Sequence, residues 1–235
     1  MNERINGFIK LCSSAGFDIN TVKAYIEGES LCAREITYAA YLLTQRYQCE
    51  LASFVYENRR APDVGELVSD GFLELFKLLL GFGLEQGLDY ISSDGGVSEE
   101  SILLSVLSLD NRDASLGTAE LLLDFGFDPE YRLPDYSVAE QIERELLDCV
   151  LECNKDTFAV ESSAYRVLLL YSYGAVPRHI SVSFAEGYGR ESLKDYHLLS
   201  VRAGLAEGEM KIDVTDSACG ALIARLAPRA QPKCG

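Results

Sequence analysis

The chain has 235 residues, 48% of them hydrophobic and 25% charged, which is enough apolar material to bury a sizeable core. Its formal net charge of −16 disfavours nucleic acid and anionic membranes as partners, because both would repel it. The same charge favours a basic protein as partner, although acidity also serves solubility alone.

Seven cysteines are scattered along the chain without a Cys-x-x-Cys pair, which favours reduced thiols over a disulfide framework. Residues 1–6 are not followed by the apolar core of a signal peptide. The longest strongly apolar run, 78–84, is too short to cross a bilayer. We therefore expect a soluble, cytoplasmic protein that binds no membrane; the sequence leaves its oligomeric state open.

Apolar residues at steps of three and four predict helices along most of the chain. In chain order the predicted helical segments are 8–14, 21–28, 34–59, 72–80, 98–107, 119–124, 137–153, 164–171 and 192–203. Asn20 or Thr21 is the expected N-cap of the second segment. The third is either one long helix or two helices broken near Gln48. A turn is expected at 61–65, which contains a proline and a glycine.

The last quarter of the chain has a different pattern. Residues 179–184 alternate between apolar and polar side chains as short strands do, and residues 211–215 do so weakly. Residues 226–235 have no apolar periodicity and are expected to fray.

Short apolar helices in this sequence end repeatedly at a glycine. The aligned glycines are Gly16, Gly83, Gly126 and Gly174, with Gly204 as a candidate fifth. Each has a leucine five residues before it and an apolar residue on both sides. Glycine takes the left-handed conformation that often follows a helix end, and its apolar neighbours pack back onto the last turn. The spacings between successive glycines are 67, 43, 48 and 30 residues. A period of roughly 30 to 50 residues is typical of a stacked solenoid, and the first gap would hold two units.

The segment 119–129, Ala-Glu-Leu-Leu-Leu-Asp-Phe-Gly-Phe-Asp-Pro, resembles the second helix and following turn of an ankyrin repeat. Segments 76–85 and 8–20 resemble the same element, and 167–177 is a weaker copy. The resemblance to a degenerate ankyrin-repeat family covers residues 70–178. It implies an all-α, ankyrin-like α-solenoid of stacked helical hairpins, although another α-solenoid or an irregular helical bundle remains open.

The sequence also departs from that family. Ankyrin repeats usually open their first helix with Thr-Pro-Leu-His, whereas the corresponding places here begin at Ser101 and Ser137. The family period is about 33 residues, so insertions are expected at 110–117 and 154–163. The predicted organisation is one helical-repeat domain, 1–225. Its parts are an N-terminal cap at 1–63, repeats at 64–178 and a C-terminal cap at 179–225.

Stacked hairpins leave a concave surface that repeat proteins use for protein recognition. The resemblance places Tyr90, Tyr131 and Tyr136 toward that surface, where tyrosine offers a large contact with a polar tip. They are the tentative protein-binding residues, unless they only cover neighbouring repeats. A basic protein is the partner favoured by charge, and an immunity-like role against a basic toxin is a conjecture from charge alone.

The sequence shows no recognisable catalytic, metal or cofactor motif, so we expect no enzyme. His179 and His197 lack metal-ligand spacing. Cys149 and Cys153 share a helix face, which is more typical of buried cysteines than of ligands. The glycine-rich segment 187–192 lacks the Lys-Ser/Thr ending of a P-loop. The alternatives are an enzyme with clustered carboxylates in a cleft and a purely structural or oligomerising protein.

Overall fold

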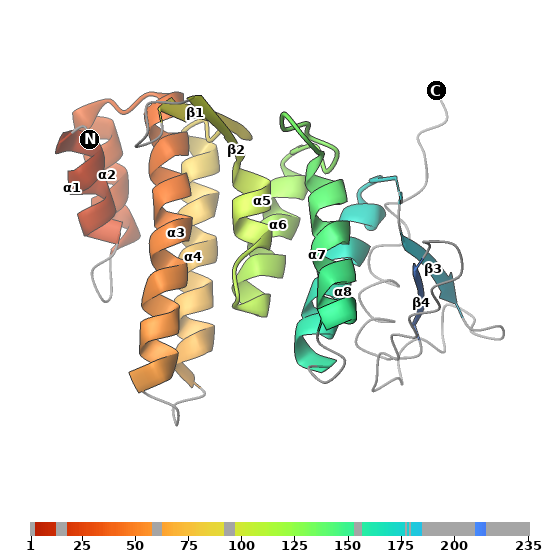
Figure 1. Cartoon of the computed structure of the whole chain (residues 1–235). Helices are drawn as coiled ribbons and strands as arrows, with labels where there is room; N and C mark the ends of the chain where they lie inside the picture. Colours follow the sequence, from red (N-terminus) through yellow and green to blue (C-terminus); the bar gives the residue numbers. More distant parts are fainter. Residues whose placement is uncertain are drawn as a thin grey trace. The chain divides into compact units, whose positions relative to one another are not determined.

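The computed structural model (Figure 1) describes residues 3–12, 18–57, 63–91, 97–152, 157–176, 178, 180–184 and 210–214. The chain divides into two compact units, Met1–Phe127 and Asp128–Gly235, here called the N-terminal and C-terminal units. The finer division into caps and repeats stays a prediction.

The N-terminal unit contains six described helices and one β-hairpin. In chain order they are α1 (Glu3–Cys12), α2 (Ile19–Glu29), α3 (Ala33–Glu57), α4 (Asp63–Gly81), β1 (Gly87–Ile91), β2 (Val97–Ser101), α5 (Ile102–Leu107) and α6 (Arg112–Asp124). Each odd-numbered helix contacts the even-numbered helix that follows it. The odd-numbered helices also contact one another in the order α1, α3, α5, and the even-numbered ones in the order α2, α4, α6. The unit therefore consists of helical hairpins in two layers (Figure 1).

The C-terminal unit contains α7 (Val138–Glu152), α8 (Thr157–Ser172), β3 (Ile180–Phe184) and β4 (Met210–Val214). Helices α7 and α8 pack together, and β3 pairs with β4 in parallel. These strands coincide with the segments predicted at 179–184 and 211–215. The described chain is otherwise mostly helical, which confirms the all-α expectation at that level. None of its helices combines the length and the apolar character needed to cross a membrane.

The helices predicted within the described residues were right in position and partly wrong at their ends, and the helix predicted at 192–203 lies outside the described residues. Helix α3 runs unbroken past Gln48, so the single-helix alternative is the observed one. Helix α4 begins at Asp63, inside the turn predicted at 61–65. Helix α2 is capped by Asp18 rather than by Asn20 or Thr21, because its carboxylate accepts hydrogen bonds from both of their backbone amides.

Two predictions around the fifth and sixth helices were wrong. Residues Ser98–Glu100 form part of strand β2 rather than a helix start, and the N-cap of α5 is Ser101. Helix α6 begins at Arg112, so the insertion expected at 110–117 is mostly helix. The longer connector instead lies between Gly83 and Ser101, where the β1–β2 hairpin stands. Likewise α8 already begins at Thr157, within the insertion expected at 154–163.

The glycine helix ends behave as the sequence predicts. Gly83, Gly126 and Gly174 all have a left-handed backbone, with φ of 89°, 106° and 99°. In each case the amide of the next residue donates to a carbonyl five residues earlier. The three bonds join Leu84 to Leu79, Phe127 to Leu122 and Ala175 to Leu170. Leu84, Phe127 and Ala175 are buried. This is the Schellman arrangement. Gly16 and Gly204 lie outside the described residues.

The same arrangement ends α2, but with a serine in the glycine position. Ser30 has φ of 51°, and the amide of the following residue, Leu31, donates to the carbonyl of Ile26 at 3.3 Å. Leu31 is buried, as the apolar residue in this position is elsewhere. A residue with a Cβ is strained in the left-handed region, so this helix end carries a cost that the glycine ends avoid.

Substitutions at these helix ends test that cost. A Cβ at Gly126 or at Gly117, which lies inside α6, would meet no atom within 4 Å, so only the backbone distinguishes them. We expect Gly126→Ala to lower the free energy of unfolding by about 1–2 kcal/mol. The matched Gly117→Ala should raise it by about 0.5–1 kcal/mol. Ser30→Gly should raise it by up to about 1 kcal/mol. Urea denaturation of the full chain measures the stability of all three variants. A Gly126→Ala protein as stable as the parent would contradict the left-handed backbone assigned to Gly126.

Candidate protein-binding surface

Three tyrosines meet where β1 lies against α3. The ring centroids of Tyr38 and Tyr90 are 6.0 Å apart, and those of Tyr41 and Tyr90 are 5.5 Å apart. The hydroxyl oxygens of Tyr41 and Tyr90 lie 3.3 Å apart and share a hydrogen bond. All three side chains are half-buried, so part of each ring is open to solvent.

Ordinary helix and strand periodicity produces this cluster. Tyr38 and Tyr41 are three residues apart in α3 and therefore share a helix face. In β1, Leu88 and Tyr90 point to the same side of the hairpin, and Leu88 is buried. The antiparallel register places Glu100 of β2 opposite Leu88, so its side chain lies on that side too. Tyr90 and Glu100 thus face α3.

Backbone hydrogen bonds attach the hairpin to the helices beside it. The buried hydroxyl of Thr37 accepts a hydrogen bond from the amide of Glu85 at 2.9 Å, just before the hairpin, and donates to a carbonyl of its own helix. Arg34 donates to the backbone oxygen of Asp89 at 3.1 Å. The amide of Ile102 donates to the carbonyl of Gln86 at 2.9 Å. The hairpin is therefore held just before β1, at the middle of β1 and at the start of α5.

Glu100 is the charged group of the cluster. Burial raises the pKa of its carboxyl, while hydrogen bonds from the hydroxyls of Tyr90 and Tyr41 act in the opposite direction. Burial also raises the pKa of Tyr41, and its hydrogen bond with Tyr90 adds to this. The stretch 78–111 contains no lysine, arginine or histidine. No ion pair joins Glu100 to a cation in the part of the chain that the structure describes.

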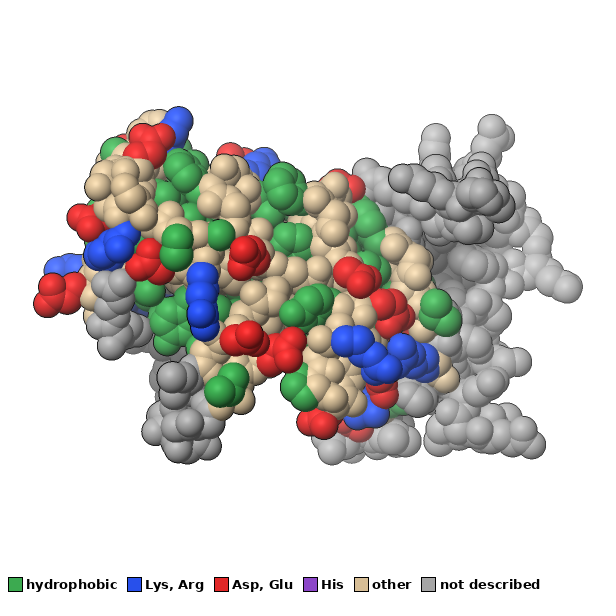
Figure 2. Space-filling model, turned by 90° about the horizontal axis from the view of Figure 1, so that it is seen from above, with side chains coloured by type: hydrophobic (Ala, Val, Ile, Leu, Met, Phe, Trp, Pro, Cys, Tyr) green, Lys and Arg blue, Asp and Glu red, His purple; other side chains and the backbone are tan. Residues whose placement is uncertain are grey.

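The opposite side of the hairpin points away from α3. Asp89 is exposed there, and Val97, at 78% exposure, is the most exposed large hydrophobic residue described. Figure 2 looks onto this end of the N-terminal unit and shows hydrophobic side chains lying between acidic ones. We call Tyr38, Tyr41, Tyr90, Glu100, Asp89 and Val97 the hairpin surface.

The structure places the three sequence-predicted binding residues in different surroundings. Tyr90 belongs to the hairpin surface of the N-terminal unit. Tyr131 and Tyr136 are half-buried in the turn before α7, in the C-terminal unit. There the carbonyl of Tyr131 accepts from the amide of Val138 at 3.0 Å, and the carbonyl of Tyr136 accepts from Leu133 at 2.8 Å. The structure therefore brings Tyr131 and Tyr136 into one turn.

Sequence reasoning missed the other members of the hairpin surface. Tyr38 and Tyr41 stand three apart in a segment predicted as helix, and that spacing was the available signal. Glu100 had no such signal, because its place beside them depends on a hairpin that was predicted as the start of a helix.

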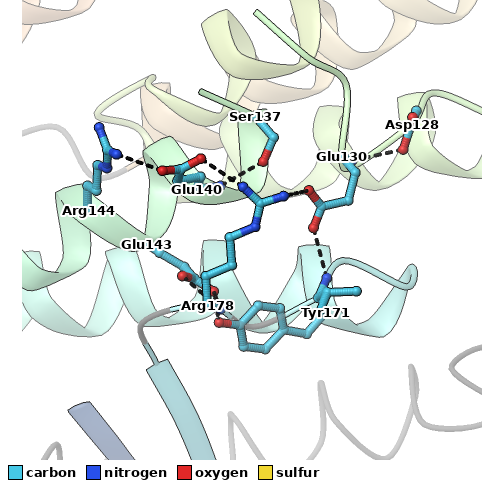
Figure 3. Close-up of polar contacts among 9 residues, drawn as sticks. Asp128, Glu130, Ser137, Glu140, Glu143, Arg144, Tyr171 and Arg178 are labelled. Atoms are coloured by element: carbon cyan, nitrogen blue, oxygen red, sulfur yellow. Dashed lines mark hydrogen bonds and ion pairs between the residues drawn. The ribbon is translucent and has the colours of Figure 1, made fainter. Parts of the chain in front are cut away.

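The C-terminal unit holds a separate cluster of carboxylates around Arg178 (Figure 3). The Arg178 guanidinium lies 3.2 Å from a carboxylate oxygen of Glu130 and 2.8 Å from one of Glu140. Its backbone amide donates to Glu143 at 3.2 Å. The hydroxyl of Tyr171 donates to the same Glu143 carboxylate.

Hydrogen-bond donors and cations occupy each of these carboxylates. Glu130 also accepts from the amide of Val176 at 2.8 Å. Burial alone would raise the pKa of Glu140, but the positive charges of Arg144 and Arg178 outweigh it, so the pKa is lowered. Glu143 is only 1% exposed. The cluster therefore ties the segment after α8 to α7 and to the turn before α7.

Other chemical candidates from the sequence fall mostly outside the described residues. Cys153, His179, His197 and residues 187–192 are among them. The sulfur of Cys149 lies 3.8 Å from the Ser163 hydroxyl, a contact between α7 and α8. Within the described ranges, no three or more His, Cys, Asp or Glu side chains gather in a way suited to hold a metal ion.

The carboxylate cluster predicts a specific cost for losing one hydroxyl. Tyr171→Phe removes a donor from a buried carboxylate, so it should lower the free energy of unfolding by about 1–3 kcal/mol. Tyr136→Phe is the matched control, since the contacts of Tyr136 are made by its backbone, and it should change stability little. Thermal unfolding followed by circular dichroism compares the two variants. Equal melting temperatures would argue against a stabilising hydrogen bond from Tyr171 to Glu143.

Glu100 and Glu140 should affect the pH dependence of stability in opposite directions. The folded pKa of Glu140 is lowered, so its contribution is present above the unfolded pKa and is lost as the pH falls through the folded value. Glu140→Gln should therefore destabilise the protein at pH 7 and flatten the acid side of the curve. The folded pKa of Glu100 is raised, so its ionisation costs stability at neutral pH. Glu100→Gln should stabilise the protein at pH 7, and the gain should vanish below the unfolded pKa of about 4.3. Urea denaturation at several pH values measures both, and shifts of the same sign would contradict the opposite roles assigned to the two carboxylates.

Comparison with family models, with curated proteins and with solved structures finds no match to this chain.

Proposed function

We propose that this chain is a protein-interaction module built from stacked, ankyrin-like helical hairpins, and that its N-terminal unit recognises a basic protein partner. The hairpin surface is the observation on which the proposal chiefly rests. It combines partly open tyrosine rings, an exposed valine and carboxylates on one edge of the helix layers. Large aromatic side chains with polar tips suit protein interfaces.

Local geometry supports the repeat part of the proposal. Two of the aligned glycines end helices in the N-terminal unit with the same hydrogen-bond pattern. Two first helices, α5 and α7, begin behind buried serines, Ser101 and Ser137, whose hydroxyls accept from the amide three residues later. These serines stand where the ankyrin pattern has threonine. The contacts between successive odd-numbered and successive even-numbered helices of the N-terminal unit support the stacked arrangement that we propose.

The charge distribution supports a basic partner. Residues 1–127 carry 20 Asp and Glu against 9 Lys and Arg, a net charge of −11. Residues 128–235 carry 17 against 12, a net charge of −5. The acidity is thus concentrated in the unit that bears the hairpin surface. An acidic surface accelerates encounter with a basic protein and disfavours acidic competitors.

The alternatives find less support in the described residues. An enzyme that uses clustered carboxylates would need one free to accept a proton, whereas those around Arg178 are held by donors. Oligomerisation would favour a large exposed apolar patch, whereas the exposed large hydrophobic residues described in the N-terminal unit are single residues of different elements, Val97 of β2 and Phe125 at the end of α6. A cytoplasmic location is part of the proposal, and the exposed free thiol of Cys32 fits a reducing compartment.

Affinity capture with the full chain tests this function. The parent chain is compared with two variants as baits. The hairpin variant carries Asp89→Lys and Glu99→Lys. The control variant carries Glu3→Lys and Glu27→Lys elsewhere in the same unit, with the same change of charge. We expect the parent and the control to retain a basic protein that the hairpin variant loses, and capture to weaken between low and high salt. Capture of no protein, or capture indifferent to salt, would count against a basic partner.

A further inference from the structure

The β1–β2 hairpin does not require a charged residue at the position of Glu100. Its carboxylate is half-buried beside Tyr90 and Tyr41, and burial raises its pKa. Withdrawing a carboxylate from water without a cation destabilises the folded state. A neutral residue opposite Leu88 would complete the hairpin without that cost. The charge of Glu100 therefore does not stabilise the hairpin.

Two cations of helices α3 and α4 have partners other than Glu100. Arg34, one helical turn before Tyr38, directs a guanidinium nitrogen to the backbone oxygen of Asp89 at 3.1 Å. Lys77 pairs with Glu74 in α4. The whole stretch 78–111 lacks basic residues. Among the described residues, no lysine or arginine forms an ion pair with Glu100.

The tyrosines around Glu100 favour one kind of cation. The rings of Tyr38 and Tyr41 are each tilted 35° from that of Tyr90, and all three remain partly open. The hydroxyls of Tyr90 and Tyr41, which share a hydrogen bond with each other, lie beside the Glu100 carboxyl and stabilise its charged form. A guanidinium stacks on aromatic faces and forms paired hydrogen bonds to a carboxylate, and it gives up water more readily than an ammonium group.

We propose that Glu100, together with Tyr38, Tyr41 and Tyr90, forms a subsite for one arginine side chain of the basic partner. The proposal rests on the function proposed above and specifies how the partner is read. The guanidinium lies against the open tyrosine rings and pairs with the Glu100 carboxylate. Asp89 and Glu99, on the other side of the hairpin, attract the rest of a basic segment without selecting arginine.

Binding of defined peptides to the full chain tests this subsite. The probes are fluorescent nonapeptides of arginine and of lysine, with dissociation constants measured by anisotropy at fixed salt. Glu100→Gln removes the charge and keeps an acceptor, and Glu3→Gln, an exposed residue of α1, makes the same change of charge away from the site. We expect Glu100→Gln to weaken the arginine peptide about tenfold and Glu3→Gln to leave it nearly unchanged. The preference of the parent for arginine over lysine should disappear in Glu100→Gln.

The outcomes separate the subsite from the proposed function. If the parent binds the arginine peptide and Glu100→Gln binds it as tightly as Glu3→Gln does, the subsite is wrong and recognition of a basic partner stands. If the parent binds neither peptide, the basic partner and the subsite both fall. Melting curves of the same samples exclude unfolding as the cause, because Glu100→Gln is expected to be at least as stable as the parent. Tyr90→Phe keeps the ring and loses the hydroxyl, so a smaller loss of arginine preference than in Glu100→Gln should follow.

Discussion

The left-handed turn after a leucine-rich helix is the constraint on which the architecture depends. At Gly83 and Gly126 it reverses the chain within two residues and buries the next apolar side chain against the helix it has just left. After Gly83 the turn leads into the β1–β2 hairpin and then into α5 of the same unit. In the N-terminal unit the odd-numbered helices contact one another, and so do the even-numbered helices. These contacts bury apolar faces that a single hairpin would expose.

The hairpin surface depends on the same turn. After Gly83, Leu84 is buried and the amide of Glu85 reaches the hydroxyl of Thr37, so β1 begins beside α3. Strand alternation then turns Leu88 and Tyr90 toward the helix and leaves Asp89 outward. The cluster of tyrosines is thus a consequence of where one helix ends. Tyr90 lies against α3 and is only half-buried. Covering a neighbouring helix and offering a surface to a partner are therefore compatible for this side chain.

The sequence predicts local features whose causes are local. The glycine helix ends were predicted because only glycine takes a left-handed backbone without strain, which marks it in any sequence. Ser30 adopts the same backbone, but nothing in its neighbourhood distinguishes it from an ordinary serine, and it was missed. The β1–β2 hairpin was also missed. Ser98-Glu99-Glu100 has the composition of a helix start, and what makes it a strand is its antiparallel pairing with β1, whose Leu88 is buried. The membership of Glu100 in the candidate site could not be predicted for the same reason.

Glu143 and Glu100 are two carboxylates whose surroundings differ in how far they compensate for lost water. Glu143 is almost fully buried and receives hydrogen bonds from Tyr171 and from the amide of Arg178, so its surroundings compensate for lost water. Glu100 is less buried, yet it receives only tyrosine hydroxyls and no cation in the described chain. A compensated carboxylate gains nothing from a new partner, whereas an uncompensated one does, because the partner's charge removes a cost that the free protein bears. By that criterion the cluster around Arg178, which carries more charge, is the structural one, and the sparser cluster around Tyr90 is the one suited to bind.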